Sequence, residues 1–216
     1  METVAQKLPV TFDEREPGPD ELRVPATLDE YWELVEEVDY AIEYLNGEII
    51  SFMGQASDVH ETLFARLIYL LEKHFDADLT YRVMGSNVKT FSEASAGSLN
   101  ADLSVVKGPS DFKVLPSGRL SKAIIRNPEI VVEVLSPGTR NYDVSEKLIC
   151  YKMIPTLQHV LFVDQKRPYA SVYSRLPEPD QWLNVDYCLL TDTVKVGDLT
   201  LPMQEIYRKT PFSVTA

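Results

Sequence analysis

The segment IVVEVL, Ile130 to Leu135, constrains the fold of this chain more than any other stretch. Its branched apolar side chains predict a buried β-strand, and the turn residues Ser136-Pro137-Gly138 end it. Glu133 interrupts the apolar run. A carboxylate in such a place costs several kcal/mol unless it is paired, hydrogen-bonded or bound to a cation. We therefore expect a partner for Glu133 close to this strand.

Patterns in the rest of the chain predict a mixed sheet flanked by two helices, that is, an α/β or α+β domain. Thr27 to Glu30 form a capping box for a helix from residue 28 to about residue 37. Asn46-Gly47 between apolar runs predicts a type I′ hairpin. An apolar stripe predicts a long helix over residues 58–75. Further strands are expected at residues 79–83, 87–91, 101–106, 129–135, 158–163, 169–174, 182–190 and 193–196.

Two segments near the buried strand complete this prediction. Residues 107–127, which are punctuated by Pro, Gly and Ser, are expected to form a long surface loop. A helix should follow the Ser-Pro-Gly turn, with Asp143 as its N-cap and Glu146 as the matching residue of a capping box. Pro155 should end that helix.

Length and composition favour one cytoplasmic domain. With 216 residues and 44% hydrophobic side chains, the chain is long enough for one substantial core. We expect that domain over residues 26–210, after an extended acidic arm at residues 1–25 and before a tail at residues 211–216. No apolar run reaches the length of a membrane span, and the N-terminus lacks the pattern of a signal peptide. We therefore expect a cytoplasmic protein without membrane contact.

Charge is distributed unevenly along the chain. The formal net charge of -12 argues against a nucleic-acid partner, because phosphate neutralisation supplies most non-specific affinity. Residues 1–50, however, carry 14 acidic and 3 basic side chains, whereas residues 107–175 carry 11 basic and 6 acidic ones. The basic middle part is either a solvated mixed face or a surface that follows phosphates beside Glu133.

Asp102 is a second acid in an apolar strand. It opens the run DLSVV and shares a strand face with Ser104 and Val106. Two neighbouring carboxylates in a low dielectric repel each other, and one keeps its proton unless a divalent cation lies between them. Oxygen ligands of this kind suit Mg²⁺ or Mn²⁺. Asp102 and Glu133 are therefore candidate metal ligands.

Lys147 is the candidate cation of the same site. The inward stripe of the helix after Glu133 should contain Val144, Leu148, Tyr151 and Ile154. Lys147 is spaced to lean toward this stripe. A lysine there can offset the acids and stabilise a developing oxyanion. Alternatively, its stem lies along the helix edge with the ammonium in water.

Glu48 and His60 are auxiliary candidates. Glu48, in the second strand of the hairpin, is either an additional ligand facing the same cleft or an exposed strand glutamate. His60, early in the long helix, should face inward. There it either lines the site or is a buried, hydrogen-bonded histidine.

Residues from about 28 to about 202 resemble the bacterial Uma-two family, which is grouped with restriction endonucleases in the PD-(D/E)XK nuclease superfamily. The resemblance rests on four stretches: YAIEYLNGEI with the later His60, NADLSVV, NPEIVVEVLSPGTRNYDVSEKLICY and IPTLQHVLFVDQKRP. It implies a restriction-endonuclease-like core, in which a mixed sheet lies between helices, with an N-terminal hairpin and extra C-terminal strands.

The resemblance also implies roles for individual residues. Asp102 and Glu133 match the ligands of Mg²⁺ or Mn²⁺, and Lys147 matches the catalytic lysine. Leu135 stands where the superfamily lysine usually follows the second acid, and the family is thought to have moved this lysine to the next helix. Ala101 stands where a proline usually precedes the first acid.

The resulting hypothesis is a divalent-metal endonuclease that cuts DNA and takes no small-molecule cofactor besides the metal. A homodimer is expected by analogy, because cutting both strands needs two sites. The alternative is a non-catalytic module that keeps the nuclease fold and binds nucleic acid or protein. A glycosidase would need an aromatic-lined cleft around its two carboxylates. The sequence shows no aromatic cluster near Asp102 or Glu133.

Overall fold

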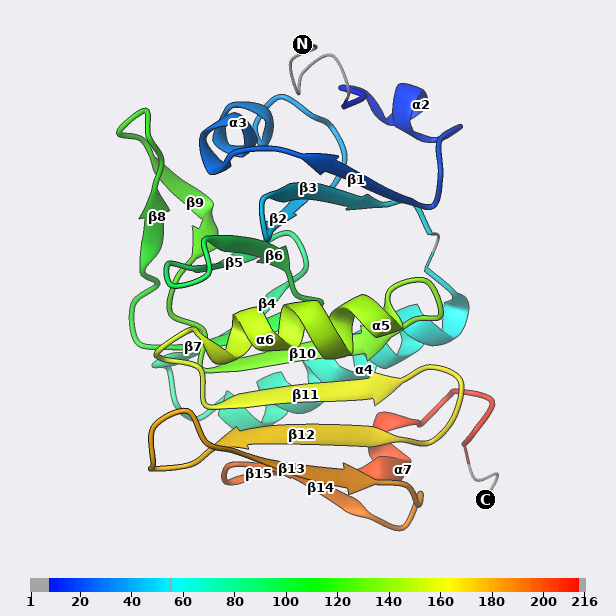
Figure 1. Ribbon diagram of the computed structural model, residues 1–216. Coiled ribbons are helices and arrows are strands. Elements are labelled where there is room, and N and C mark those ends of the chain that lie inside the picture. The colour runs from blue at the N-terminus through cyan, green and yellow to red at the C-terminus, as the bar shows by residue number, and fades with distance from the viewer. Residues whose placement is uncertain (1–7, 55, 214–216) are drawn as a thin grey trace.

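The computed structural model describes residues 8–54 and 56–213, and these form two large mixed sheets with helices packed on them (Figure 1). The predicted α+β fold is therefore confirmed. The N-terminal sheet has the strand order β1-β3-β2-β6-β5-β9-β8. Its strands are β1 (Glu21–Pro25), β2 (Glu43–Leu45), β3 (Glu48–Phe52), β5 (Lys89–Ser92), β6 (Gly97–Asn100), β8 (Phe112–Val114) and β9 (Leu120–Ile125), and two short helices, α2 (Phe12–Arg15) and α3 (Leu28–Leu34), accompany them.

The hairpin β2–β3 forms as its sequence predicts. Asn46 and Gly47 have φ angles of 52° and 83°, the positive values that a type I′ turn requires at both central positions. Thr27 caps α3 with the predicted capping box, and the helix ends at Leu34, earlier than expected. Because Glu43 precedes Leu45 by two residues, both side chains lie on the same face of the sheet.

The second sheet has the strand order β13-β12-β11-β10-β7-β4. Its strands are β4 (Tyr81–Gly85), β7 (Leu103–Lys107), β10 (Ile130–Leu135), β11 (His159–Asp164), β12 (Ala170–Arg175) and β13 (Trp182–Tyr187). The central strand β10 runs parallel to β11 and antiparallel to β7. Both of its faces are buried, as the apolar run predicts.

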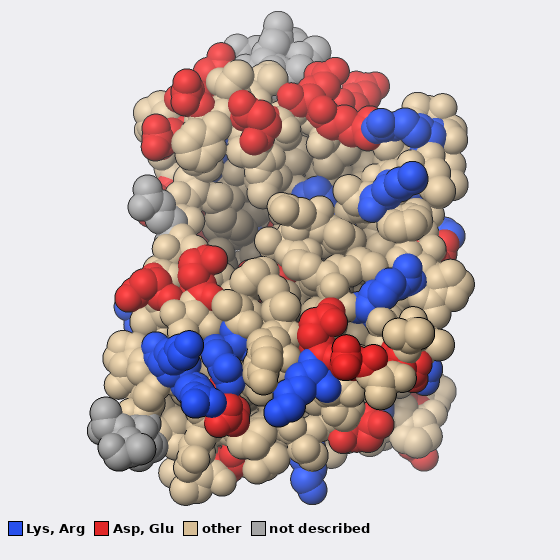
Figure 2. Space-filling model, turned by 180° about the vertical axis from the view of Figure 1, so that it is seen from behind, with Lys and Arg blue, Asp and Glu red and all other residues tan. Residues whose placement is uncertain are grey.

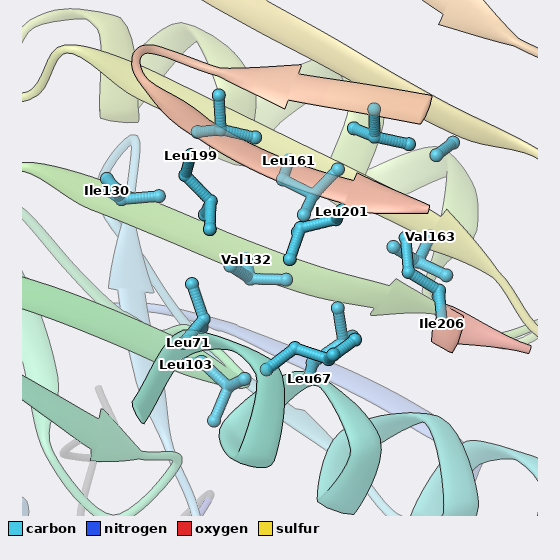
Figure 3. Packing of buried hydrophobic residues seen from close by; sticks show 14 of the residues in the cluster. Leu67, Leu71, Leu103, Ile130, Val132, Leu161, Val163, Leu199, Leu201 and Ile206 are labelled. Atoms are coloured by element: carbon cyan, nitrogen blue, oxygen red, sulfur yellow. The ribbon is translucent and has the colours of Figure 1, made fainter. Parts of the chain in front are cut away.

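Helices cover both faces of the second sheet (Figure 1). Helix α4 (Asp58–Phe75) packs on the face that contains Val132, together with the hairpin β14 (Thr193–Val196) to β15 (Leu199–Pro202) and the short helix α7 (Met203–Ile206). Figure 3 shows Leu67 and Leu71 of α4 against Leu103 and Val132 in this core.

The opposite face, which includes Glu133, is covered by one continuous helical segment. It begins as α5 (Arg140–Tyr142), widens into a π-helical turn η1 (Asp143–Lys147) and ends as α6 (Leu148–Lys152). Leu148 and Tyr151 pack against Val131 and Leu135, the apolar neighbours of Glu133 on its own face. The π turn therefore lies directly over the carboxylate in the strand.

Three further expectations from the sequence differ from the structure. The segment 107–127 is not one loop, because it contains β8 and β9, whose apolar runs are too short to indicate strands. Asp143 is not an N-cap: the helix begins at Arg140, and Thr139 Oγ1 donates to Asp143 Oδ2 (2.6 Å) instead. Within residues 8–25, α2 and β1 replace the expected extended arm, since β1 pairs with β3; residues 1–7 lie outside the described part.

In the described ranges, 8–54 and 56–213, none of the helices is long and apolar enough to cross a bilayer. Phe212, in the expected C-terminal tail, packs against the core under α4. Residues 214–216 of that tail lie outside the described part.

Candidate functional site

A cavity of about 410 Å³ lies between the two sheets. Residues of β2, β3, β10, the first turn of α4 and the π turn η1 line it. The cavity is lined by two lysines, Lys147 and Lys166, and by His60. Its acidic lining residues are Asp20, Glu21, Glu43, Asp102, Glu133 and Asp143. Carboxyl groups outnumber lysines by six to two, so the lining is rich in acidic groups and favours cations; this cavity is called the anionic cavity below.

Glu133 lies at the inner end of this cavity and is only 3% exposed. Its Oε1 accepts hydrogen bonds from Tyr151 Oη (2.6 Å) and Lys147 Nζ (3.1 Å), and its Oε2 accepts one from the amide of Asp102 (3.1 Å). Burial raises the pKa of Glu133 to about 8, against the opposing effect of the Lys147 ammonium. The partners expected for this carboxylate are therefore present.

The side chains of Asp102 and Glu133 each accept a hydrogen bond from a backbone amide of the neighbouring chain segment. The amide of Val134 donates to Asp102 Oδ2 (2.6 Å), while the amide of Asp102 donates to Glu133. Backbone pairing of β7 with β10 ends at Leu103 opposite Val132, so these two side chains take the place of the next pair of backbone bonds. The Asp102 side chain is 21% exposed, and it thus faces the cavity from the edge of the site.

Lys147 is enclosed by acceptors and only 6% exposed. Its Nζ lies 2.7 Å from Asn100 O, 3.1 Å from Glu133 Oε1, 3.2 Å from Glu43 Oε1 and 3.3 Å from Asp143 Oδ1. Burial alone would lower the pKa of Lys147, but the surrounding carboxylates, Glu133 first, raise it well above its ordinary value. The lysine is therefore a fixed positive charge, and its side chain points inward, which is one of the two alternatives that its spacing left open. Val144, expected in the same inward stripe, is exposed instead.

Glu43 is a site residue that the sequence reasoning missed. It is 6% exposed, and its carboxylate accepts hydrogen bonds from the amide of Asn100 (2.7 Å) and from Tyr142 Oη (2.7 Å) besides contacting Lys147. The signal was the one that identifies Glu133: Glu43 is an acid between Ile42 and Tyr44 in an apolar strand. Asp143, interpreted as a helix-start residue, belongs to the same acidic group around Lys147.

The two auxiliary candidates have different positions. His60 lines the cavity, with Nε2 3.6 Å from Asp102 Oδ2, and the Asp102 carboxylate raises the pKa of this imidazole. Glu48 does not line the cavity. Its carboxylate pairs with Arg23 (3.2 Å), which also binds Glu146 on the π turn (2.8 Å). Arg23 thus connects the N-terminal sheet to the helical segment, and Glu48 belongs to this ion-pair network instead of facing the site.

The donor set fits a hard divalent cation with few protein ligands. Among the residues that the structure describes, no three His, Cys, Asp or Glu side chains gather in the geometry of a metal centre. Asp102 and Glu133 alone would supply carboxylate oxygens, and within the same residues Asp102 Oδ1 accepts no hydrogen bond. Mg²⁺ commonly binds one or two carboxylates and keeps several waters. The chemistry of these residues is therefore compatible with Mg²⁺ or Mn²⁺.

The protein is similar to two proteins of Synechocystis sp. (strain ATCC 27184 / PCC 6803 / Kazusa). Uncharacterized protein sll1609 is 29% identical over 157 residues, covering 73% of this chain and 84% of its own length. Uncharacterized protein slr1290 is 31% identical over 159 residues, which cover 74% of this chain and 78% of the length of slr1290.

A solved structure has the same fold. It is described as a putative nuclease belonging to DUF820 from Anabaena variabilis ATCC 29413, and it superimposes with a TM-score of 0.67 at 20% identity. The match covers 85% of this chain and 98% of that one. The model of the Uma2 family, described as "Putative restriction endonuclease", matches residues 28–206. Because this match spans most of the sequence, the chain belongs to the Uma2 family of restriction-endonuclease-like proteins.

Proposed function

We propose that this protein is a divalent-metal-dependent endonuclease that hydrolyses phosphodiester bonds in DNA. The observation that supports this most directly is the anionic cavity, where Asp102 and Glu133 face each other beside a buried lysine. Family membership supports a nuclease on independent grounds. Because cutting both strands of a duplex needs two such sites, the active form is proposed to be a homodimer.

Asp102 and Glu133 would hold the cation. When bound, Mg²⁺ or Mn²⁺ would polarise a phosphoryl oxygen and increase the acidity of a coordinated water. The raised pKa of Glu133 means that the carboxylate keeps a proton more readily than an ordinary glutamate. Metal binding would therefore release a proton from this residue near neutral pH.

Lys147 would stabilise negative charge on the reacting phosphate. Glu43 and Asp143 hold its ammonium at the wall of the cavity and keep it protonated. A charge that is already fixed in place needs no reorganisation as the transition state forms. His60, in the first turn of α4, would orient Asp102, and the amino end of this helix favours an anion in the cavity.

A titration of Mg²⁺ and Mn²⁺ followed by calorimetry, combined with nicking of plasmid DNA, tests this proposal. We expect saturable binding in the parent protein and its loss in both Asp102→Asn and Glu133→Gln. Glu48→Gln should keep binding and nicking, because Glu48 lies outside the cavity. Lys147→Met, whose folding is checked by its melting curve, should keep metal binding and lose nicking.

One observation favours a second candidate function. Lys147 Nζ already donates hydrogen bonds to Asn100 O and Glu133 Oε1 and lies 3.2 Å from Glu43 and 3.3 Å from Asp143, an arrangement that a purely structural ion network also requires. If the parent protein binds no divalent cation, the nuclease proposal is wrong. The protein would then be a binding module in which Glu133 and Lys147 form a buried structural pair.

A further inference from the structure

A second cavity, of about 350 Å³, adjoins the anionic one. The two cavities share Ser136, Pro137 and Lys166 in their linings, so they are continuous at one edge. The topology explains this position. Because β10 and β11 are parallel neighbours, the segments that follow their carboxyl ends lie side by side, at the kind of edge where open α/β sheets bind ligands.

The second cavity has the opposite charge. Three basic side chains line it, Arg140 from the start of α5 and Lys166 and Arg167 from the turn after β11, against the single carboxylate of Asp164. Lys166 and Arg167 are exposed to solvent. Lining residues therefore give this cavity an excess of positive charge where the neighbouring cavity has an excess of negative charge.

Asp164 fixes the positions of these cations. It is 5% exposed, and its Oδ2 accepts a hydrogen bond from Arg140 Nη1 at 2.5 Å, with Arg167 Nε 3.7 Å away. Its Oδ1 accepts from the amide of Lys166 (2.8 Å), which sets the course of the turn. Both guanidinium groups also lie over the ring of Tyr169, at 4.8 Å for Arg167 and 5.9 Å for Arg140. The two guanidinium groups are thus held in a defined arrangement, and the backbone of Lys166 is fixed beside them.

A polyanion cannot be retained by the acidic cavity alone, because its carboxylates repel phosphate. Ordered guanidinium and ammonium groups next to it are suited to phosphate oxygens, since arginine donates through a planar fork and lysine acts as a point charge. Figure 2 shows acidic side chains gathered at the end of the molecule formed by α3 and β1, whereas Lys and Arg are more frequent toward the other end. The distribution of charge therefore favours a polyanion path away from the N-terminal sheet.

We propose that Arg140, Lys166 and Arg167, here called the basic ledge, bind the phosphodiester backbone of DNA beside the phosphate that enters the anionic cavity. This inference rests on the proposed nuclease function and identifies where its substrate is held. The ledge contacts phosphates and no base edges, so it binds without regard to sequence.

Fluorescence anisotropy with labelled duplex DNA, measured in EDTA over a range of salt concentrations, tests the basic ledge. Lys166→Gln/Arg167→Gln is the variant, because both side chains are exposed; Arg140 stays, since it neutralises the buried Asp164. Losing two phosphate contacts should reduce the slope of log affinity against log salt concentration by about 1.8 and weaken binding. Lys122→Gln/Lys195→Gln, which removes two exposed lysines elsewhere, should leave the slope unchanged.

The outcomes separate this inference from the function it rests on. An unchanged slope in the ledge variant, or no salt-dependent DNA binding by the parent, overturns the basic ledge even where Mg²⁺ binding and nicking are present. A reduced slope supports the ledge. If it is reduced in a protein that binds no divalent cation, the ledge stands and the catalytic proposal fails. Calorimetric Mg²⁺ binding should be retained in the ledge variant, because neither Lys166 nor Arg167 contacts Asp102 or Glu133, and loss of the Lys166 charge from the lining makes the anionic cavity no less favourable to a cation.

Discussion

Glu43 illustrates how a single carboxylate shapes the charge of its neighbours. It contacts Lys147, Tyr142 and the amide of Asn100 within one buried cluster. It keeps the lysine protonated and turned toward Glu133, and a positively charged, immobile lysine is the form that can stabilise a phosphate. We therefore propose that Glu43 is a positioning residue that acts through Lys147.

Replacing Glu43 by Gln should lower the free energy of unfolding by about 1.5–3 kcal/mol, because a hydrogen-bonded buried charge is lost. Nicking activity should fall, while the calorimetric affinity for Mg²⁺ changes little, since Glu43 is not one of the proposed ligands. Glu48→Gln is the matched control: the same substitution in the same hairpin breaks a half-exposed pair with Arg23 and should cost less than about 1 kcal/mol. Equal losses in the two variants would contradict the role given to Glu43.

Sequence reasoning found part of this site and missed part of it for a physical reason. An acid within an apolar strand is conspicuous, and the structure brings Asp102, Glu133, Lys147 and His60 to one cavity. Their chemical roles remain predictions. The sequence led to Glu48 and not to Glu43, because the alternation of side chains along a strand predicts which face a residue lies on but not how deeply it is buried. Both lie on the same face of the hairpin, and only tertiary packing decides which is buried.

Long elements with local signals lie close to their predicted positions, whereas short elements that depend on tertiary contacts, such as β6 and β8, were not predicted. Helix α4 has the predicted boundaries, because its apolar stripe and cap are both local. The π turn η1 was not predicted. Such a turn has no sequence signature of its own, and it places Asp143 and Lys147 on the same inner side. Short strands such as β8 depend on their partner strand for stability.

Gly97, in β6, marks the close approach of the N-terminal sheet to α6. A Cβ added there would lie 2.4 Å from Cys150 Sγ, so Gly97→Ala should destabilise the protein by about 1–3 kcal/mol through overpacking. Urea unfolding measures this. Adding Cys150→Ala should recover part of the loss, so that the double variant is more stable than the sum of the single changes implies. Gly85→Ala, where the added Cβ makes only an ordinary contact, is the control.

At the scale of the whole molecule, the buried acids make stability depend on pH. Burial raises the pKa of Glu133 to about 8, and Asp102 raises that of His60. Between about pH 5 and about pH 8 the folded state therefore holds a proton on Glu133 that the unfolded chain has released, and above about pH 6.5 the same holds for His60, so the free energy of unfolding falls as pH rises. Each such proton contributes a slope of at most about 1.4 kcal/mol per pH unit.

Urea unfolding of the parent and of Glu133→Gln across this pH range, in EDTA, isolates the contribution of Glu133. The parent should lose stability relative to the variant as pH rises, because the glutamine side chain of the variant has no proton to release. A difference between the two proteins that is constant with pH would show that Glu133 is ionised throughout the range.

The reciprocal bonds between Asp102 and Glu133 have a consequence for how the protein can be observed. Two backbone amides, those of Asp102 and Val134, donate to carboxylates instead of carbonyls. Their resonances and their exchange with solvent deuterium therefore follow the charge on those carboxylates. A ligand that draws the two carboxylates toward itself weakens these hydrogen bonds between β7 and β10. The chemical shifts and exchange rates of both amides therefore report whether the cavity is occupied.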